Sequence, residues 1–327
     1  MPVGRGAGDE LTRWLTRSQN VFQDVVLLGL ACACLALVTP PAVAARVTVV
    51  LSDDSPPYQE VYQAVRDHLQ GGPHDLSRAY AQGLTTGSLD GTHLAVTVGV
   101  RAAESVATLA GRTPVLAVLV PRSWYAKGGR ARLLDSGRRS VAAIYLDQPF
   151  ERQAELIRLA LPDAQRAGVL MSEDQEGLVG ELEAALQARQ LGLVLGILPS
   201  EGRLMNTLEN VLSESDVLLA ETDPRVFNRN TAQSLLLTSY RYRTPVLGYS
   251  HSLTRAGALL SLHSSPAQIG RQTAESVIVA LQGGAVRLPP PAHPVYFSIS
   301  INEQVARSLG YTLPPEDELE KRLGAPR

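Results

Sequence analysis

Several side chains that can bind a ligand stand directly after apolar, strand-like runs of the sequence. Ser52 and Asp53 follow the first such run, and Gly99, Val100 and Arg101 follow a later one. Parallel strands end at one edge of a sheet, and open α/β folds bind their ligands at that edge. These two turns therefore predict part of a binding site.

Both turns also have a purely structural interpretation. Asp53 and Asp54 could form a carboxylate pair, or they could cap a helix that begins at Pro56. The backbone N–H groups after Gly99, with Arg101 beside them, suit a carboxylate or phosphate group. The alternative is a tight turn that leaves Arg101 in solvent. Under the functional interpretation, Arg101 favours an anionic ligand.

Three later strand ends add further candidates. Tyr145 and Asp147 could line a crevice between the lobes. The alternative for Tyr145 is packing in the core. Asp223 precedes a proline and could be a helix cap, or it could hold an ammonium group. Tyr249 and Ser250 lie in "GYSHS", which is similar to a nucleophile elbow but lacks its closing glycine, so a turn after a buried strand is favoured.

The sequence carries no signature of catalysis. Its six histidines are scattered without the spacing of a metal site, and it has no Walker A loop and no GxGxxG turn. A formal charge of −2 creates no basic field for nucleic acid. We therefore expect no enzyme activity, metal, cofactor or nucleic-acid partner. Trp124 and Tyr125 lie in a predicted loop. They could form an aromatic lid over a site, or they could pack against their own domain.

Strand-like and helix-like segments alternate along the chain, which is typical of βαβ units with parallel strands. The predicted strands are 47–51, 94–98, 115–120, 141–145, 167–171, 193–198, 217–220, 244–248, 258–262 and 295–301. The predicted helices are 58–69, 102–110, 150–161, 177–190, 204–212, 228–240, 266–282 and 303–309. These strands are too many for one comfortable sheet, so we expect an α/β fold of two doubly wound, Rossmann-like lobes.

Three segments rich in proline and glycine are candidate joints between the lobes, at 121–137, 249–257 and 283–294. Three joints predict a three-segment hinge. We accordingly assign 46–144 plus 253–287 to the first lobe, and 145–252 plus 288–327 to the second.

The first 45 residues are predicted to be a secretory signal peptide. Arginines precede the uncharged apolar run Val25–Val38, and Ala42-Val43-Ala44 fits the small-x-small pattern of a cleavage site. Cys32 and Cys34 both lie in this segment, so the exported chain would have no cysteine. These features predict a periplasmic protein, and the alternative is an N-terminal membrane anchor.

Five stretches, in order, resemble the substrate-binding proteins of ABC transporters. The similarity is to the type I periplasmic binding proteins, in the uncharacterised-transport-system branch that includes aromatic amino acid binders. The stretches are "VTVGVRAAESVA" (96–107), "RQAELIRLALPDAQRAGVLMSEDQEG" (152–177), "ESDVLLAETDPRVFN" (214–228), "TPVLGYSHSLTRAGALLSL" (244–262) and "FSISINEQVARSLGYTLP" (297–314).

The resemblance implies a non-catalytic binder that closes over a small solute by hinge motion. Such a protein delivers its solute to an ABC permease in the inner membrane, and we expect a monomer. Family ligand contacts come from strand-end turns, which places them here at Ser52, Gly99 to Arg101, Asp223 and Ser250. An envelope sensor of the same fold, acting through protein contacts without transport, is the alternative.

The sequence departs from the family pattern around the expected pocket. Val100 stands where a threonine hydroxyl is usual, and "AVLVPRSW" (117–124) and "AAIYLDQP" (142–149) replace the usual motifs. These changes argue against copying an amino acid specificity. Arg101 could replace the lost donor and favour an anion. We therefore expect a small solute that is either amino-acid-like, as the resemblance implies, or anionic.

Overall fold

The computed structural model describes residues 44–135, 139–199 and 204–326. The predicted signal peptide, including Cys32 and Cys34, lies outside the described residues except for Ala44 and Ala45. Ala45 belongs to the folded unit, because it is buried and its carbonyl accepts a hydrogen bond from the Asp75 amide at 3.0 Å. Among the described residues, no helix is long and apolar enough to cross a membrane.

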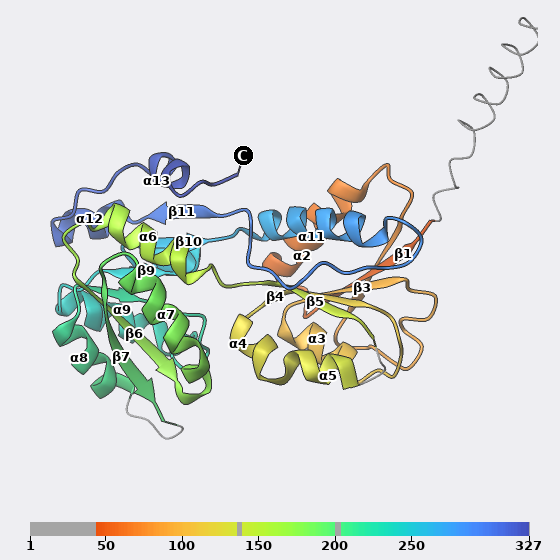
Figure 1. The fold of residues 1–327 in the computed structure, drawn as a ribbon, viewed down its shortest axis with the longest axis horizontal. Coiled ribbons are helices and arrows are strands. Elements are labelled where there is room, and N and C mark those ends of the chain that lie inside the picture. Colours follow the sequence, from red (N-terminus) through yellow and green to blue (C-terminus); the bar gives the residue numbers. More distant parts are fainter. Residues whose placement is uncertain (1–43, 136–138, 200–203, 327) are drawn as a thin grey trace, which may run out of the picture. The chain divides into compact units, whose positions relative to one another are not determined.

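The first sheet consists of five parallel strands in the order β2-β1-β3-β4-β5 (Figure 1). Its central strands are rich in valine and buried on both faces, as expected for parallel strands covered by helices on both sides. The strands are β1 (Arg46–Leu51), β2 (Asp75–Tyr80), β3 (Leu94–Val98), β4 (Val115–Val120) and β5 (Val141–Tyr145).

Helices cover both faces of this sheet and complete the first lobe. On one face α2 (Pro56–Leu69) packs beside α11 (Pro266–Leu281), although the two helices are far apart in sequence (Figure 1). The other face carries α3 (Val100–Ala107) and α5 (Arg130–Asp135). A short helix α4 (Arg122–Trp124) and a π-helical turn (Tyr125–Gly129) lead into α5.

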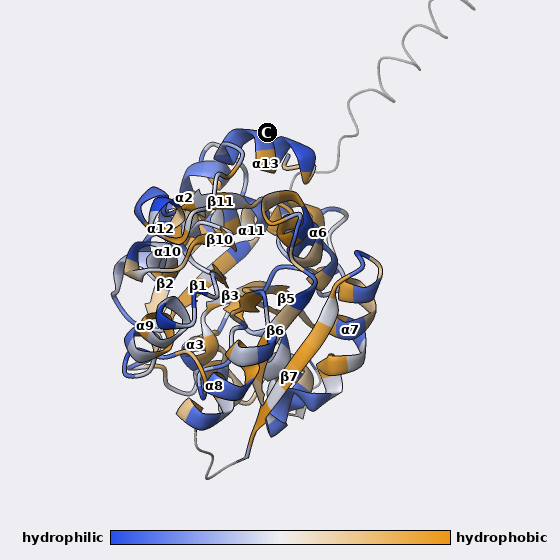
Figure 2. Ribbon diagram, turned by 90° about the vertical axis from the view of Figure 1, so that its left-hand side faces the viewer, coloured by the Kyte–Doolittle hydropathy of each residue, from blue (hydrophilic) through white to orange (hydrophobic). Residues whose placement is uncertain are grey.

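The second sheet has six strands in the order β11-β10-β9-β8-β6-β7. All are parallel except the edge strand β11, which runs antiparallel to β10. The sheet strands carry mainly hydrophobic residues, as Figure 2 shows for β6 and β7. The strands are β6 (Arg166–Ser172), β7 (Gly192–Leu198), β8 (Val217–Leu219), β9 (Val246–Gly248), β10 (Leu260–His263) and β11 (Ser298–Ile301).

Two separate hydrophobic clusters sandwich this second sheet. One face packs against α6 (Phe150–Ala160), α7 (Val179–Gln187), α12 (Glu303–Leu309) and α13 (Glu316–Arg322). The opposite face packs against α8 (Leu204–Glu214), α9 (Ala232–Arg241) and α10 (His251–Ala256). The predicted fold of two doubly wound α/β lobes is confirmed.

The structure adds a strand that the sequence analysis missed. The segment "DLSRAY" of β2 is largely polar, because it is an edge strand that pairs only with β1. An edge strand needs no continuous apolar run, since one side of it faces solvent. The apolar strands β3, β4 and β5 coincide with the predicted ranges.

The chain crosses between the lobes three times, but two crossings differ in position from the predicted joints. Segment 121–137 is no joint, because its helices return the chain to β5 in the same sheet. Parallel neighbours require such a crossover connection. Segment 249–257 likewise forms α10 between β9 and β10 of the second sheet. The predicted placement of 253–287 in the first lobe therefore differs from the structure, where α10 and β10 belong to the second lobe and α11 and Val286 pack in the first. The predicted start of the second lobe at 288 differs as well, because Leu288 packs in the first lobe and Ala292 pairs with Ile144 of β5.

The observed crossings follow β5, follow β10 and precede β11, and polar side chains tie them together. Gln148 of the first crossing donates to the Ser264 hydroxyl of the second at 2.9 Å. Ser264 donates in turn to the Tyr296 carbonyl of the third at 2.6 Å. Arg152 of α6 connects the first and third crossings, because it donates to the Gln148 side chain at 2.6 Å and to the Pro294 carbonyl at 3.0 Å. Hydrogen bonds thus link the three crossing segments of the hinge to one another.

Candidate functional site

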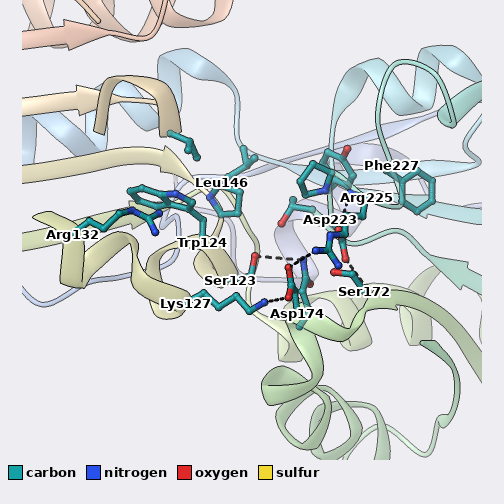
Figure 3. Close-up of a pocket in the computed structure, with 16 residues that line it drawn as sticks. Ser123, Trp124, Lys127, Arg132, Leu146, Ser172, Asp174, Asp223, Arg225 and Phe227 are labelled. Atoms are coloured by element: carbon teal, nitrogen blue, oxygen red, sulfur yellow. Dashed lines mark hydrogen bonds and ion pairs between the residues drawn. The ribbon is translucent and has the colours of Figure 1, made fainter. Parts of the chain in front are cut away.

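A cavity of about 600 Å³ lies where the carboxyl ends of strands from the two sheets meet (Figure 3). This volume is typical of sites for small molecules. The first lobe contributes Val100, Pro121, Ser123, Trp124, Lys127, Arg132 and, at the first crossing, Leu146. The second lobe contributes Ser172, Asp174, Gln175, Thr222, Asp223, Pro224, Arg225, Phe227 and Tyr249.

Three of the residues predicted from the sequence line this cavity: Val100, Asp223 and Tyr249. Each lies in a connection that follows a strand. Val100 opens α3, so the cavity has an apolar surface at this position. Tyr249 follows β9 and packs edge-on against Phe227, with 6.3 Å between ring centroids. Burial raises the pKa of the Tyr249 hydroxyl, so it stays protonated and can donate.

The Asp223 carboxylate holds two loops of the second lobe together. One oxygen accepts from the Ser172 amide at 2.7 Å and the other from the Arg225 amide at 2.9 Å. The side chain is almost fully buried. Asp223 therefore fixes the position of its neighbours in the wall and also lines the cavity. It caps no helix, because the residues after it form a turn and α9 begins only at Ala232.

Ser52 and Gly99 are structural residues of the turn that precedes α3. The Ser52 hydroxyl donates to the Val98 carbonyl at 2.8 Å and accepts from the Ala102 amide at 3.1 Å. Gly99 has a positive φ of 88°, and a Cβ there would lie 2.5 Å from the Ser52 hydroxyl oxygen. Neither residue lines the cavity.

Arg101 and Asp53 also stand outside the cavity lining. Arg101 is exposed on the first turn of α3. The Asp53 carboxylate accepts from the Ser55 amide at 2.9 Å, and this hydrogen bonding lowers the pKa of Asp53. Asp53 thus has a local role in the turn before α2. Arg101 does not lie where it could bind an anion in this cavity.

Tyr145 and Ser250 do not line the cavity either, and both have structural roles. The Tyr145 ring packs edge-on between Tyr125 and the hinge residue His293, with centroid distances of 5.7 Å and 5.2 Å. Burial raises the pKa of its hydroxyl. The Ser250 hydroxyl caps α10 by accepting from the Leu253 amide at 3.2 Å.

Trp124 forms part of the cavity wall and is held firmly by its own lobe (Figure 3). Its indole N–H donates to Glu104 at 3.1 Å, and the Arg132 guanidinium lies 5.7 Å from the ring centroid. A Cβ on Gly129 would come within 2.7 Å of the ring, so the indole lies directly on that backbone. Trp124 therefore packs on its own domain and lines the site at the same time.

Ionic side chains from both lobes meet at the cavity. Asp174, which follows β6, forms ion pairs with Lys127 of the first lobe and Arg225 of the second, the latter at 3.1 Å (Figure 3). The hydrogen bond from Lys127, followed by the charge of Arg225, lowers the pKa of Asp174. The sequence analysis missed all three residues. Asp174 had the available signal, since it lies three residues after the end of a predicted strand.

A second ionic contact between the lobes lies beside the cavity. Arg122 donates to both carboxylate oxygens of Glu181, at 2.6 Å and 2.5 Å. This bidentate geometry is the strong form of an arginine–carboxylate pair. The pairing raises the pKa of Arg122 and lowers that of Glu181. The lobes are thus in direct contact at more than one place.

Two buried acids stand between the cavity and the hinge. The Asp147 carboxylate accepts from the Arg122 amide at 2.6 Å and from the Thr222 hydroxyl. Its pKa is raised by burial. Glu221 is only 5% exposed, and burial, followed by the charge of Asp147, raises its pKa well above the ordinary value. Glu221 is therefore an acid that favours its neutral form.

The chemistry available in this cavity is that of binding. Its wall combines aromatic and aliphatic surface with a small number of ionic and hydroxyl groups, which is the usual composition of a small-molecule site. Among the described residues, no group of three or more His, Cys, Asp and Glu could hold a metal ion.

Comparisons with known proteins fit this architecture. A family model described as "ABC transporter substrate binding protein" matches residues 131–321. No curated protein sequence matches the chain. Among solved structures, the chain is similar to an ABC domain in complex with L-Trp from Streptococcus pneumoniae (TM-score 0.60, 18% identity, 86% of this chain and 99% of that one).

A second similar structure is the ligand-free, open form of a substrate-binding protein with adhesive properties from Clostridium difficile. It has a TM-score of 0.65 at 17% identity and covers 84% of this chain and 97% of that one. A conserved domain protein from Vibrio cholerae matches with a TM-score of 0.58 at 21% identity, over 87% of this chain and 100% of that one. At these identities the structures establish the shared fold.

Proposed function

The chain belongs to the ABC transporter substrate-binding protein family, and on that premise we propose that its two lobes capture a small solute for an ABC importer. The observation that carries this proposal is the 600 Å³ cavity lined by side chains of both lobes. A solute bound there contacts both halves, so binding favours their approach. The captured solute then passes to a permease in the inner membrane.

The solute that we propose is amino-acid-like or anionic. The cavity offers apolar surface at Val100, Trp124 and Phe227, together with ionic groups that can orient a polar head. Because the wall has binding groups rather than a nucleophile paired with a base, the proposed role is binding without catalysis. We further propose a periplasmic location, as expected from the predicted signal peptide, with Ala45 retained in the folded protein.

A thermal-shift screen tests the proposal. The purified protein is heated with individual amino acids, short peptides and small carboxylates and phosphates. A solute at a hundredfold excess over its dissociation constant should stabilise the protein by about 2.7 kcal/mol. The same solute should have a much smaller effect on Trp124→Ala, which removes cavity wall, than on Tyr240→Ala, whose side chain is exposed outside the cavity.

Stabilisation that survives Trp124→Ala unchanged would contradict binding in this cavity. An absence of any response across the panel would favour the alternative, an envelope sensor of the same fold that acts through protein contacts. The replacement of a hydroxyl by Val100 in the cavity wall is the one observation on the side of that alternative.

A further inference from the structure

The cavity contains three cationic side chains, and two of them remain available to a solute. Arg132 is committed to the wall, because its guanidinium lies over the Trp124 ring and pairs with Glu104 at 3.4 Å. Lys127 and Arg225 instead share the single carboxylate of Asp174. Their side chains are each 47% exposed, so they are accessible from the cavity they line.

The charges at this point do not balance. Asp223, the other acid of the wall, already accepts backbone hydrogen bonds on both of its oxygens. Two cations and one carboxylate leave an excess of one positive charge at the Lys127–Asp174–Arg225 cluster. An ammonium group carries three N–H donors and a guanidinium five, which is more than one carboxylate can accept. The cluster therefore has spare donors and spare charge for a second anion.

We propose that Lys127 and Arg225 form the anion-recognition site of the cleft, and that they bind a carboxylate or similar monoanionic group of the solute. The Asp174 carboxylate then competes with the solute anion for the same donors and so lowers the affinity for the solute. This inference rests on the proposed function, because it names the solute class that the same cavity selects. Lys127 and Arg225 come from different lobes, so an anion between them links the lobes.

The wall around the cluster specifies the rest of the solute. Trp124 and Phe227 stand on opposite sides of the cavity in Figure 3, and the prolines Pro121 and Pro224 add apolar surface. Since Trp124 is fixed by Gly129, Glu104 and Arg132, its ring is a preformed platform. The solute class is therefore an anion attached to an apolar or aromatic body.

An ammonium group fits the cluster less well. Asp174 is the only carboxylate with an exposed side chain among the cavity residues, and a cation placed beside it would also lie close to Lys127 and Arg225. Like charges this close to one another repel, so the two cations destabilise a third. The local repulsion thus disfavours an amine and separates this proposal from recognition of a zwitterion by Asp174.

Isothermal titration calorimetry on the intact protein distinguishes these cases with four probes of similar body: phenylacetate, benzyl alcohol, benzylamine and L-phenylalanine. Phenylacetate should bind most tightly. Lys127→Gln and Arg225→Gln should each weaken it by at least about tenfold, the range for losing a charged hydrogen bond. Asp174→Asn should strengthen it several-fold, because the competing charge is gone. Arg307→Gln, in the exposed ion pair with Glu303 within α12 outside the cavity, is the matched control and should leave the affinity unchanged.

Tighter binding of benzylamine, benzyl alcohol or L-phenylalanine, or a weaker phenylacetate complex in Asp174→Asn, would overturn the proposal. Failure of all four probes to bind would overturn it as well. The proposed function would survive that result if the broader solute screen still found a ligand that depends on Trp124. Thermal melts of each variant show whether a lost signal reflects unfolding.

Discussion

At the scale of single residues, the acids near the cleft differ because their surroundings differ. Asp174 is exposed beside two cations, which favour its charged form. Glu221 is buried next to Asp147, and both the loss of hydration and the like charge favour its neutral form. One acid therefore acts as an ionic partner, and the other makes the stability of the protein depend on pH.

The raised pKa of Glu221 predicts a specific pH profile. The unfolded chain loses the proton of Glu221 near the ordinary value of 4.5, whereas the folded protein keeps it to higher pH. Stability should therefore decline as pH rises from about 4.5 to the folded-state pKa, by at most about 1.4 kcal/mol per pH unit. Glu221→Gln cannot ionise, so its unfolding free energy, measured with urea across this pH range, should decline less steeply.

The slope of the profile is the informative quantity, because a glutamine can shift the absolute stability by its own contacts. Glu60→Gln, at an exposed position of α2, is the control and should keep the wild-type slope. Asp147 has a raised pKa too, so part of the decline should remain in the Glu221 variant. Equal slopes in wild type and Glu221→Gln would rule out the buried acid as their source.

At the scale of elements, the turn between β3 and α3 depends on one glycine. Gly99 combines a positive φ of 88° with a close approach to Ser52 and to the Tyr58 ring, at 2.5 Å and 2.9 Å from an added Cβ. Residues other than glycine rarely adopt this backbone conformation. The turn brings Val100 to the cavity wall, so the backbone of Gly99 matters to the site although it is not a lining residue.

Gly99→Ala should lower the free energy of unfolding by roughly 2–4 kcal/mol, because strain from the positive φ adds to the steric clash. Chemical denaturation monitored by circular dichroism measures the change. Gly180→Ala is the matched control: it lies in α7 with open space around an added Cβ, and it should be neutral or slightly stabilising. A loss of similar size in both variants would contradict the conformational argument.

At the scale of the whole molecule, ionic contacts join two lobes that each have their own hydrophobic clusters. Arg122–Glu181 and Lys127–Asp174 both cross from one lobe to the other. Partly exposed ion pairs contribute little to stability, about 0–1 kcal/mol each. Even that small energy can shift the balance between lobe arrangements, since each lobe keeps its own packing when they separate.

Arg122→Gln should therefore change the arrangement of the lobes more than it changes stability. We expect a larger radius of gyration in small-angle X-ray scattering without solute, together with a melting temperature shifted by no more than a few degrees. High salt should reduce the difference between variant and wild type. Arg307→Gln removes an arginine from an exposed pair with Glu303 within α12 and should leave the scattering unchanged. Identical scattering of all three proteins would contradict a role of Arg122 in holding the lobes together.

Local patterns in the sequence were sufficient for most of the fold. Buried parallel strands such as β3, β4 and β5 are continuous apolar runs, and helices such as α6 and α11 carry regular apolar spacing and proline or capping signals. The polar edge strand β2 and the helices within 122–135 were missed. In the first case solvent replaces one neighbour, and in the second the glycines of the π-helical turn hide the helical pattern.

The sequence by itself determined which turns end the strands, and therefore placed Val100, Asp223 and Tyr249 at the cavity. Only the tertiary structure decided that Lys127, Asp174 and Arg225 meet there, and that Arg101 does not line it. The physical reason is that strand-end positions follow from periodicity along the chain, whereas contacts between lobes depend on where the hinge crosses and how each helix is turned. Those orientations are set by packing between segments distant in sequence, which no local pattern records.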